Sequence, residues 1–218
     1  MGKVQNQDLH GSSQVNYIII TEDELLAQAK RLADYHKQRD GFSSIVVTAS
    51  QVFNEFSSGS PDPTALRDFV KMFYDRAGSD TTLRPKYLLL FGDASFDYKN
   101  RLKSNTNKVP SYESEISLDP LNTYTSDDFF GFLDDGDNIN SPGTILLDIG
   151  IGRIPANTPA EAQSIVDKIV VYNSPAALGP WRNELSFFAD DEDANLHLND
   201  AEVITAAAEA TAPVLSLD

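Results

Sequence analysis

The sequence predicts an α/β fold: a three-layer sandwich with a mainly parallel sheet, helices on both faces and an added β-hairpin. Short apolar runs, each a candidate strand, alternate with segments that repeat apolar residues at helical spacing, as parallel βαβ units require. The runs are continuously apolar rather than alternating, which is expected of strands buried on both faces. The clearest run is Tyr87–Phe91, which is bounded by Pro85 and Gly92.

The first helix is predicted between two strands, at residues 17–20 and 44–48. Thr21 and Glu24 have the spacing of a capping box, in which each side chain accepts a hydrogen bond from the other residue's backbone. The apolar residues that follow lie on one helical face. Gly41 is suited to end the helix, because glycine readily adopts the left-handed conformation found there. This segment therefore predicts a strand–helix–strand unit.

The second helix is predicted to begin at Asp62 and Pro63. These residues match an N-cap and a first-turn proline, a position that needs no backbone N–H. From Leu66 onward, apolar residues recur at i, i+3, i+4 and i+7, as on one face of a helix. After the strand Tyr87–Phe91 comes a polar stretch at 94–124. Loops of that length are usually functional or disordered.

The second half of the chain is predicted to add a hairpin and two more helices. Residues 129–133 and 144–149 flank a turn rich in Asp, Asn and Gly, and form either the two hairpin arms or one added strand. The run Thr158-Pro-Ala-Glu161 combines a capping box with a first-turn proline and opens a helix. That helix runs to residue 172, and it is followed by a strand at 184–189, a helix at 199–210 and a short strand at 213–217.

Composition excludes several classes of protein. The chain has 33 acidic and 17 basic residues and a formal charge of −16, which argues against nucleic acid or an anionic membrane as a partner. It contains no cysteine, so these residues supply no disulfide, zinc-thiolate site or thiol nucleophile. No apolar run reaches the roughly 18 residues of a membrane helix. Residues 1–16 have no apolar core of a signal peptide.

Acidic residues follow several predicted strands. Asp93 comes after the third strand, and Asp148 is interpreted as lying near the end of its predicted strand at 144–149. Residues 190–193, after the strand at 184–189, are all acidic. Ligands of open α/β sheets gather at the carboxyl ends of strands, so these carboxylates are candidate site residues. Capping of the next turn or helix explains any one of them equally well.

The loop at 134–138 is a candidate calcium site. Asp134, Asp135, Asp137 and Asn138 surround a glycine. Such oxygen-bearing side chains suit calcium, which takes roughly six to eight oxygen ligands. The spacing does not match an EF-hand, because the glutamate of that motif is missing. An ordinary Asp-Gly hairpin turn is the alternative.

The sequence does not support several other kinds of site. Gly150 and Gly152 do not form a dinucleotide fingerprint, because Pro155 stands at the third glycine position and the glycines lie within an apolar strand. Neither a nucleotide nor a flavin is predicted. Ser95 follows a strand but lacks the glycines of a nucleophile elbow. His197, in the predicted loop before the last helix, is the one histidine that is a candidate site residue, with a surface or capping role as the alternative.

Several motifs, taken in order, carry a resemblance to a known family. They are Tyr87-Leu-Leu-Leu-Phe-Gly-Asp93, Thr125-Ser-Asp-Asp-Phe-Phe-Gly131, Asp148-Ile-Gly-Ile-Gly-Arg-Ile-Pro155, and Phe188-Ala-Asp-Asp-Glu-Asp-Ala-Asn-Leu-His197 with Asp200-Ala-Glu202. No single motif is specific. Their ordered combination, over nearly the whole chain, resembles the gingipain-like cysteine peptidases. Within that family it is most similar to the sortases of the bacterial type IX secretion system.

The resemblance implies a caspase-like α/β catalytic domain built from two subdomains. The catalytic histidine and cysteine of the family both lie in the second subdomain, and this chain contains neither of their motifs. By resemblance, residues 15–218 are the first subdomain, preceded by a leader or linker at 1–14. Such a fragment is expected to be inactive by itself and to pair with its own C-terminal subdomain.

The resemblance also implies roles for individual residues. Glu192 matches a glutamate that orients the catalytic histidine and stabilises its cation. Asp93 and Asp148 match acidic positions that help to hold a structural calcium ion, to which the 134–138 loop supplies further oxygens. Asp200 lies near the position of an acidic residue that selects basic substrate side chains. His197 is grouped with Asp200 as a substrate-binding candidate.

For function, the resemblance implies a cysteine endopeptidase or transpeptidase that works through an acyl-enzyme. Its partners would be cargo proteins with a C-terminal secretion signal and other components of the secretion system. The enzyme would cut the signal from the cargo and join the cargo to a lipopolysaccharide. It would be exported to the bacterial cell surface and associated with the outer membrane. A non-catalytic α/β interaction module stabilised by calcium is the alternative.

Overall fold

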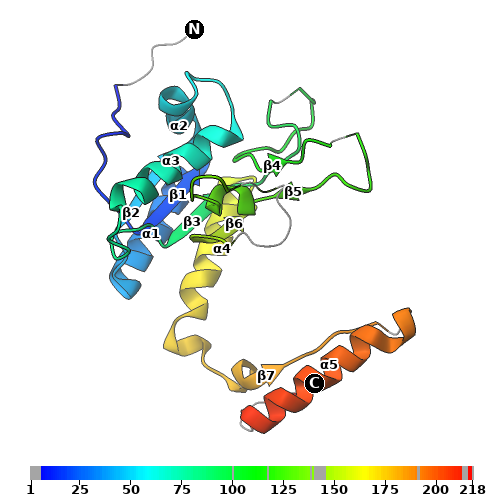
Figure 1. Cartoon of the computed structure of the whole chain (residues 1–218). Coiled ribbons are helices and arrows are strands. Elements are labelled where there is room, and N and C mark those ends of the chain that lie inside the picture. Colours follow the sequence, from blue (N-terminus) through cyan, green and yellow to red (C-terminus); the bar gives the residue numbers. More distant parts are fainter. Residues whose placement is uncertain are drawn as a thin grey trace. The chain divides into compact units, whose positions relative to one another are not determined.

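A computed structural model of the chain describes residues 6–99, 101–116, 118–137, 139, 146–190, 192–212 and 216–217. Figure 1 labels the elements along the chain. The chain divides into two compact units, Met1–Lys168 and Ile169–Asp218. Residues 15–218, expected from the sequence to form one subdomain, are shared between these two units.

A four-stranded parallel sheet is the centre of the first unit. Its strands are β1 (Tyr17–Thr21), β2 (Ser44–Thr48), β3 (Tyr87–Phe91) and β6 (Gly150–Ile154). They lie in the order β2-β1-β3-β6, and each pair of neighbours is parallel. The parallel α/β class predicted from the continuous apolar runs is confirmed.

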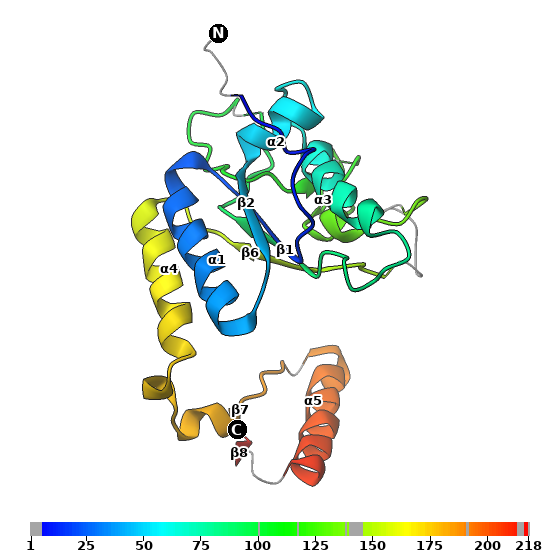
Figure 2. The same cartoon turned by 90° about the vertical axis from the view of Figure 1, so that its left-hand side faces the viewer.

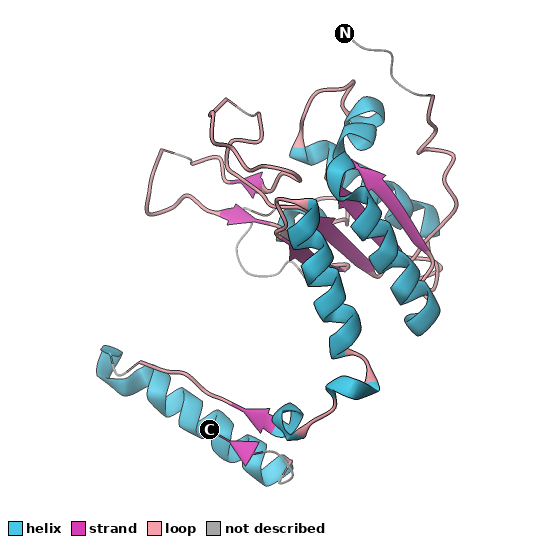
Figure 3. Cartoon of the chain, turned by 180° about the vertical axis from the view of Figure 1, so that it is seen from behind, coloured by secondary structure: helices cyan, strands magenta, loops and turns pink. Residues whose placement is uncertain are grey.

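Helices cover both faces of this sheet. α1 (Leu26–Asp40) and the first part of α4 (Pro159–Tyr172) lie on one face, where Arg31 and Asp167 form an ion pair of 2.5 Å. α2 (Ala49–Phe56) and α3 (Pro63–Ala77) lie on the other face, as Figures 2 and 3 show from two sides. The first unit is therefore the three-layer sandwich that the sequence predicts.

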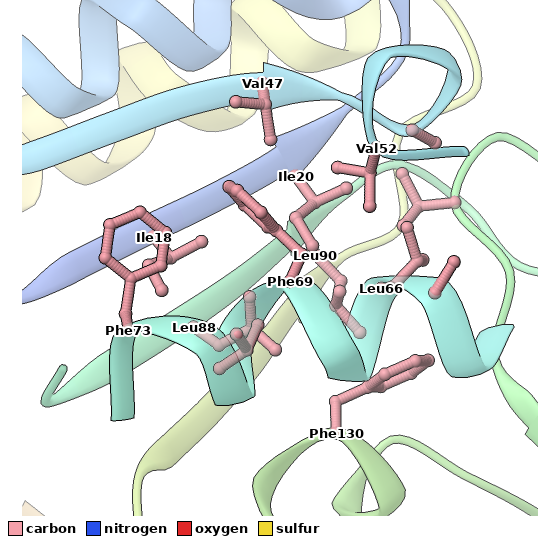
Figure 4. Close-up of a cluster of buried hydrophobic side chains, with 14 of the residues drawn as sticks. Ile18, Ile20, Val47, Val52, Leu66, Phe69, Phe73, Leu88, Leu90 and Phe130 are labelled. Carbon is pink, nitrogen blue, oxygen red and sulfur yellow. The ribbon is translucent and has the colours of Figure 1, made fainter. Parts of the chain in front are cut away.

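The core of the first unit lies between the sheet and α3. Ile18, Leu88 and Leu90 come from the central strands and are at most 1% exposed. Phe69 and Phe73 of α3 lie over them in Figure 4, with their rings edge to face and 5.3 Å apart at the centroids. Burying one such side chain contributes about 1.5–3 kcal/mol. This helix–sheet contact is therefore a main source of stability for the unit.

The end of β2 leads directly into α2, a helix that was not predicted from the sequence. Thr48 and Gln51 form a capping box: Gln51 N–H donates to Thr48 Oγ1 at 3.3 Å, and Thr48 N–H donates to Gln51 Oε1 at 2.9 Å. Threonine followed three residues later by glutamine is a local signal for a helix start. The sequence therefore carried the information for α2.

The capping box predicted at Thr21 and Glu24 is wrong. Thr21 is the last residue of β1, and its hydroxyl donates to the carbonyl of Phe91 on the neighbouring strand at 2.8 Å. A short 3-10 helix, η1 (Asp23–Leu25), follows, and α1 begins at Leu26 without a side-chain cap. The cross-strand hydrogen bond thus takes up the hydroxyl that would have capped the helix.

Three of the other predicted helix ends are confirmed. Gly41 follows α1 with a φ of 72°, in the left-handed region. Asp62 accepts a hydrogen bond from Thr64 N–H at 2.9 Å at the start of α3. At the start of α4, Glu161 N–H donates to Thr158 Oγ1 at 3.2 Å, and Thr158 N–H donates to Glu161 Oε2 at 3.2 Å. These caps form from neighbouring residues alone.

The hairpin is present but was placed wrongly. It is a short antiparallel pair, β4 (Tyr112–Glu113) with β5 (Thr125–Ser126). The predicted arm at 129–133 instead overlaps a 3-10 helix, η2 (Asp128–Gly131). The described residues of the other predicted arm, 146–149, form no strand, and residues 144 and 145 lie outside the described residues.

Residues 7–14 form an N-terminal strap that packs on α2 and α3. Leu9 N–H donates to both carboxylate oxygens of Glu55, at 2.8 and 2.9 Å, and Gln7 Nε2 donates to the same side chain at 2.8 Å. Gln14 Nε2 donates to the carbonyl of Phe73 at 2.6 Å. Leu9 itself is only 7% exposed. The predicted leader or linker is thus held against the core over its described part.

The second unit contains the end of α4 and short elements around one long helix. They are η3 (Pro175–Ala177), η4 (Pro180–Asn183), β7 (Glu184–Leu185), α5 (Glu192–Thr211) and β8 (Ser216–Leu217). β7 and β8 pair in parallel, although β7 is shorter than the strand predicted at 184–189. α5 begins earlier than the helix predicted at 199–210, and it contains no buried residue. Among the described helices, none combines the length and apolar character needed to cross a bilayer.

Candidate functional site

The strand order of the sheet changes direction between β1 and β3. The chain passes from β1 to β2 on one side and then crosses to β3 on the other side. In open α/β sheets, ligands bind outside the carboxyl ends of the strands at such a point. Here Glu22 and Glu24 follow β1, and Gly92 and Asp93 follow β3. Burial raises the pKa of Glu22, and the charge of Asp23 adds to this effect.

Residues 105–110 of the chain itself occupy the space at the carboxyl ends of β1 and β3. We call these residues the crevice segment. The backbone N–H groups of Lys108 and Val109 donate to the carbonyl of Asp93 at 2.9 and 3.1 Å. The Lys108 ammonium also pairs with the Glu24 carboxylate after β1. Gly92 leaves room for the segment, because a Cβ at this position would lie 2.8 Å from Lys108 Cβ. The crevice is therefore occupied by protein.

Arg153 holds the crevice segment from the neighbouring strand β6. Its Nη1 donates to the carbonyls of Gly92 and Val109 at 2.8 and 2.7 Å. Its Nε and Nη2 donate to the two carboxylate oxygens of Asp127, both at 2.7 Å. The two side chains are only 13% and 25% exposed, so water screens this bidentate pair weakly. Arg153 thereby joins β6, the loop after β3 and the start of η2.

Asp93 lies at the carboxyl edge, as predicted, and its side chain joins two loops. Oδ2 accepts hydrogen bonds from Thr106 Oγ1 at 2.8 Å and from Asn157 Nδ2 at 3.1 Å. The backbone N–H of Asp93 donates to the carbonyl of Ala156 at 3.1 Å. The observed role of this carboxylate is therefore to connect the loop after β3 with the loop after β6.

Asp148 lies at the opposite, amino edge of the sheet. It precedes β6, which begins at Gly150, so its placement near the end of a strand is wrong. Its Oδ2 accepts the N–H groups of Leu133 and Asp134, at 2.7 and 3.2 Å. The hydroxyl of Tyr74 lies 3.0 Å from Asp148 Oδ1 and 2.8 Å from Asp134 Oδ1. Burial, followed by these two carboxylate contacts, raises the pKa of Tyr74.

Asp93 and Asp148 therefore do not share a metal ion. Asp93 lies beyond the last residue of β3, and Asp148 lies before the first residue of the parallel strand β6. Strand residues advance by about 3.3 Å each, so the strand between the two carboxylates separates them by more than about 15 Å. Calcium binds its oxygen ligands at about 2.3–2.6 Å. The part of the calcium prediction that brought these two residues together is wrong.

The acidic loop after η2 does not form a ready-made calcium cage. Asp135 pairs with Lys71 at 3.0 Å, and Asp137 Oδ2 accepts the N–H of Asp134 at 3.2 Å. Both oxygens of Asp148 already accept hydrogen bonds. Over the described ranges, no three acidic or histidine side chains converge in a way that would hold a metal ion. Asn138 lies outside those ranges, and calcium binding by this loop stays a prediction.

The predicted catalytic and substrate-binding residues all lie on α5. Glu192 is the first residue of this helix, and His197 and Asp200 lie within it. The placement of His197 in a loop is therefore wrong. The backbone from Asp193 to Asn195 has φ values of 52° to 62°, in the left-handed region. His197 Nε2 is 3.8 Å from Asp193 Oδ2, with side chains 57% and 76% exposed, so this ion pair is weak.

Sequence reasoning missed Arg153 and Tyr74. Arg153 stands in the middle of the apolar strand Ile-Gly-Arg-Ile, and a charged side chain at a half-buried strand position needs a partner of opposite charge. That signal was available, although the partner Asp127 was not identifiable from spacing. Tyr74 lies on the apolar face of α3, where nothing local distinguishes it from a core residue.

Residues 10–218 match the sequence profile of Peptidase family C25. The chain belongs to this family, that of the gingipains. This chain is 37% identical to PorU from Porphyromonas gingivalis, whose solved structure is described as dimeric and latent. The two structures superpose with a TM-score of 0.68 over 82% of this chain and 17% of the PorU chain.

Two other relatives are more distant. The Arg-specific cysteine proteinase gingipain R is 16% identical to this chain. The two structures superpose with a TM-score of 0.62 over 92% of this chain and 40% of the gingipain R chain, which shows a shared fold. An uncharacterised protein from Archaeoglobus fulgidus is 28% identical over 174 residues, 79% of this chain and 38% of that protein. This chain thus spans less than half the length of each of these three relatives. The predicted family and the caspase-like fold are confirmed.

Proposed function

We propose that this chain is a scaffold within the catalytic domain of a cysteine peptidase, and that the full-length protein is a sortase of a type IX secretion system. The observation that supports this most directly is the 37% identity to PorU over 82% of the chain. In this role the enzyme acts at the bacterial cell surface, in association with the outer membrane. It removes C-terminal secretion signals from cargo proteins and joins the cargo to a lipopolysaccharide.

The nucleophile of the proposed reaction is a cysteine supplied by another part of the full-length protein, since these residues contain none. Its thiolate attacks the carbonyl carbon of the scissile peptide bond. The C–N bond breaks, the leaving amine takes a proton from the catalytic histidine, and the cargo is left as a thioester. Water or an acceptor amine then attacks the thioester and releases the thiolate. The chain described here is proposed to be inactive by itself.

Glu192 is proposed as a positioning residue that orients the catalytic histidine. It comes after β7 along the chain and is the first residue of α5, and site residues of α/β folds commonly follow a strand. His197 and Asp200 are three residues apart on the helical part of α5 and therefore lie on one face. This placement supports their proposed joint role in binding substrate.

Replacing Glu192 by glutamine in the full-length protein tests this proposal. We expect kcat/KM for cargo cleavage to fall by about 10²–10⁴-fold, because the amide cannot stabilise the imidazolium. The pH profile should also change: the limb that reports the histidine should move to lower pH, an effect that a purely structural role would not produce. Glu192→Asp should restore part of the rate.

The matched control for this experiment is Glu209→Gln, on the last turns of the same helix. It removes the same charge and should leave both the rate and the pH profile unchanged. The isolated 218-residue chain serves as a blank and should show no hydrolysis. Peptidase activity of that chain, blocked by a thiol-alkylating reagent, would refute its proposed inactivity. An unaltered pH profile for Glu192→Gln would refute the role of Glu192.

Calcium binding is proposed for the loop that contains Asp134, Asp135 and Asp137. Millimolar calcium should raise the melting temperature by several degrees, since a ligand at about 100 times its Kd adds about 2.7 kcal/mol of stability. Asp137→Asn should remove most of this increase, whereas Asp93→Asn, at the other edge of the sheet, should retain it. Identical melting curves in calcium and in a chelator would show that the loop binds no calcium.

A further inference from the structure

A pocket of about 710 Å³ lies between the loop after β3 and the β4–β5 pair. It is lined by Phe96, Tyr98, Glu113, Ser114, Thr123, Tyr124 and Thr125. Small-molecule sites commonly have volumes of about 300–1,000 Å³ and combine apolar walls with few polar groups. None of Glu192, His197 and Asp200 belongs to this lining. All of the lining residues belong to the first unit of the chain.

Glu113 is the one charged side chain among the described residues that line the pocket. Its Oε1 is buried and has no hydrogen-bond partner in the described part of the chain. Burial raises the pKa of this carboxyl group. A buried acceptor without a donor costs free energy, so a ligand that brings a donor to Glu113 would recover that cost.

Aromatic rings form the apolar walls of the pocket. Phe96 is 68% exposed and Tyr124 is 41% exposed, although both are large side chains that usually bury much of their surface. The Lys99 ammonium lies over the Tyr98 ring, 5.3 Å from its centroid. This contact shows that the ring face of Tyr98 already attracts a cation, as the negative face of an aromatic ring does.

The polar side of the pocket is fixed by paired strands. Ser114 N–H donates to the carbonyl of Tyr124 at 3.0 Å, and Tyr124 N–H donates to Ser114 Oγ at 3.1 Å. Thr123 Oγ1 lies 3.4 Å from the same Ser114 hydroxyl. Because Glu113 precedes Ser114 and is itself paired with Thr125, these bonds hold its backbone in one position. The Glu113 carboxylate is therefore held by the β4–β5 pair. Figure 1 labels these two strands.

We propose that this pocket binds a small organic cation, a protonated primary amine attached to an apolar body. The ammonium donates to Glu113, and the apolar body packs against the rings of Phe96 and Tyr98. A neutral ligand of the same shape leaves Glu113 without a charged partner, and an anion is repelled. The formal charge of −16 on the chain also favours the approach of a cation.

Titration of the 218-residue chain with benzylammonium, followed by calorimetry, tests the proposal. Benzyl alcohol, a neutral ligand of nearly the same shape, should bind at least about 10-fold more weakly, since a charge-assisted hydrogen bond contributes more than a neutral one. Glu113→Gln should weaken benzylammonium binding by a similar factor. Glu115→Gln, which removes the same charge from an exposed neighbour, should not alter it.

A second variant keeps the test decisive if Glu113→Gln fails to fold. Tyr98→Leu retains the apolar wall but removes the aromatic face, and should weaken the cation more than the alcohol. The proposal is overturned if benzylammonium shows no saturable binding at millimolar concentration, or if benzyl alcohol binds equally well. Equal loss of affinity in Glu113→Gln and Glu115→Gln would also overturn it, because it would indicate general charge attraction.

Discussion

Glu55 is the residue on which the N-terminal strap depends. Burial acts to raise its pKa, but hydrogen bonds from Leu9, His10 and Gln7 outweigh this and lower the pKa to about 2. His10 Nδ1 lies 2.8 Å from Glu55 Oε2, and the His10 ring stacks on Phe56 with centroids 4.5 Å apart. A single carboxylate thus gathers most of the polar contacts that attach residues 7–10 to α2.

Lowering the pH should decrease the stability of the folded protein, because it protonates Glu55. Because the pKa of Glu55 falls from an ordinary 4.5 to about 2 on folding, its ionised form stabilises the folded state above pH 4.5. This contribution is lost as the pH falls from 4.5 toward 2. Glu55→Gln should therefore be less stable than the native protein at neutral pH, and the difference should shrink in that acid window. Urea unfolding at several pH values measures it.

The control for Glu55 is Glu24→Gln, which removes a carboxylate whose pair with Lys108 lies away from the strap. This substitution should leave the attachment of residues 7–14 to α2 unchanged. Proteolysis of the strap gives a second readout, since residues 7–14 should be cut faster in Glu55→Gln at neutral pH. A stability difference between native protein and Glu55→Gln that stays constant from neutral pH to pH 2 would contradict this account.

Single residues also show where sequence reasoning reaches its limit. Asp62 and Thr158 cap helices as predicted, because their partners lie within three residues along the chain. Thr21 has the same local pattern but donates to Phe91, which is distant in sequence. A local motif therefore predicts a cap correctly only where no strand neighbour competes for the same hydroxyl.

At the scale of elements, the junction between β3 and the crevice segment is a close contact at the carboxyl edge of the sheet. Gly92 has a φ of 156°, and a Cβ there would lie 2.8 Å from Lys108 Cβ and 3.1 Å from Val109 Cγ2. Gly92→Ala should displace residues 105–110 and destabilise the protein by about 1–3 kcal/mol, the usual cost of overpacking. Denaturant unfolding measures the change.

Gly152 provides the matched comparison for Gly92. It lies on β6, and a Cβ at this position would meet only Leu89 Cδ1, at 3.9 Å. Gly152→Ala should therefore leave stability within about 1 kcal/mol of the native value, because alanine restricts the unfolded chain without straining the folded one. If the two substitutions had equal effects, Gly92 would not be the position that accommodates the crevice segment.

The wrong position predicted for the hairpin also concerns whole elements. Residues 129–133 and 144–149 have the composition of two arms around a turn. In the structure, Asp148 instead accepts the backbone N–H groups of Leu133 and Asp134, so a side chain joins these segments at the point where a ladder was expected. A turn does form at residues 134–137, where Asp137 N–H donates to the carbonyl of Asp134 at 3.2 Å. Turn composition does not, however, distinguish a strand pair from a loop held by a carboxylate.

For the whole molecule, the sequence was sufficient for the α/β class and for the family, because both depend on the order of motifs. It was not sufficient for the position of Asp93 and Asp148 at opposite edges of the sheet. Two acidic residues beside two apolar runs look alike in sequence. Which end of a parallel strand each one occupies depends on where the strand begins, here at Gly150 rather than at Asp148.

The two units should also differ in local stability. α3 has buried residues along its length, from Ala65 to Ala77, whereas α5 has none over its 20 residues. Local opening is least costly where few apolar contacts are buried. In the isolated chain, we therefore expect backbone amides of α5 to exchange with deuterium at least about 100-fold faster than those of α3. Mass spectrometry of peptides from the two helices measures this ratio.

Intrinsic helix propensity is the competing explanation for any protection of α5, because its sequence is rich in alanine. The two causes separate on substitution. Ala207→Gly, in the second half of this helix, should speed exchange throughout α5 if only propensity holds it together, and should leave α3 unchanged. Slow exchange of α5 that survives Ala207→Gly would mean that this helix is stabilised by packing. That result would contradict the absence of a buried face on α5.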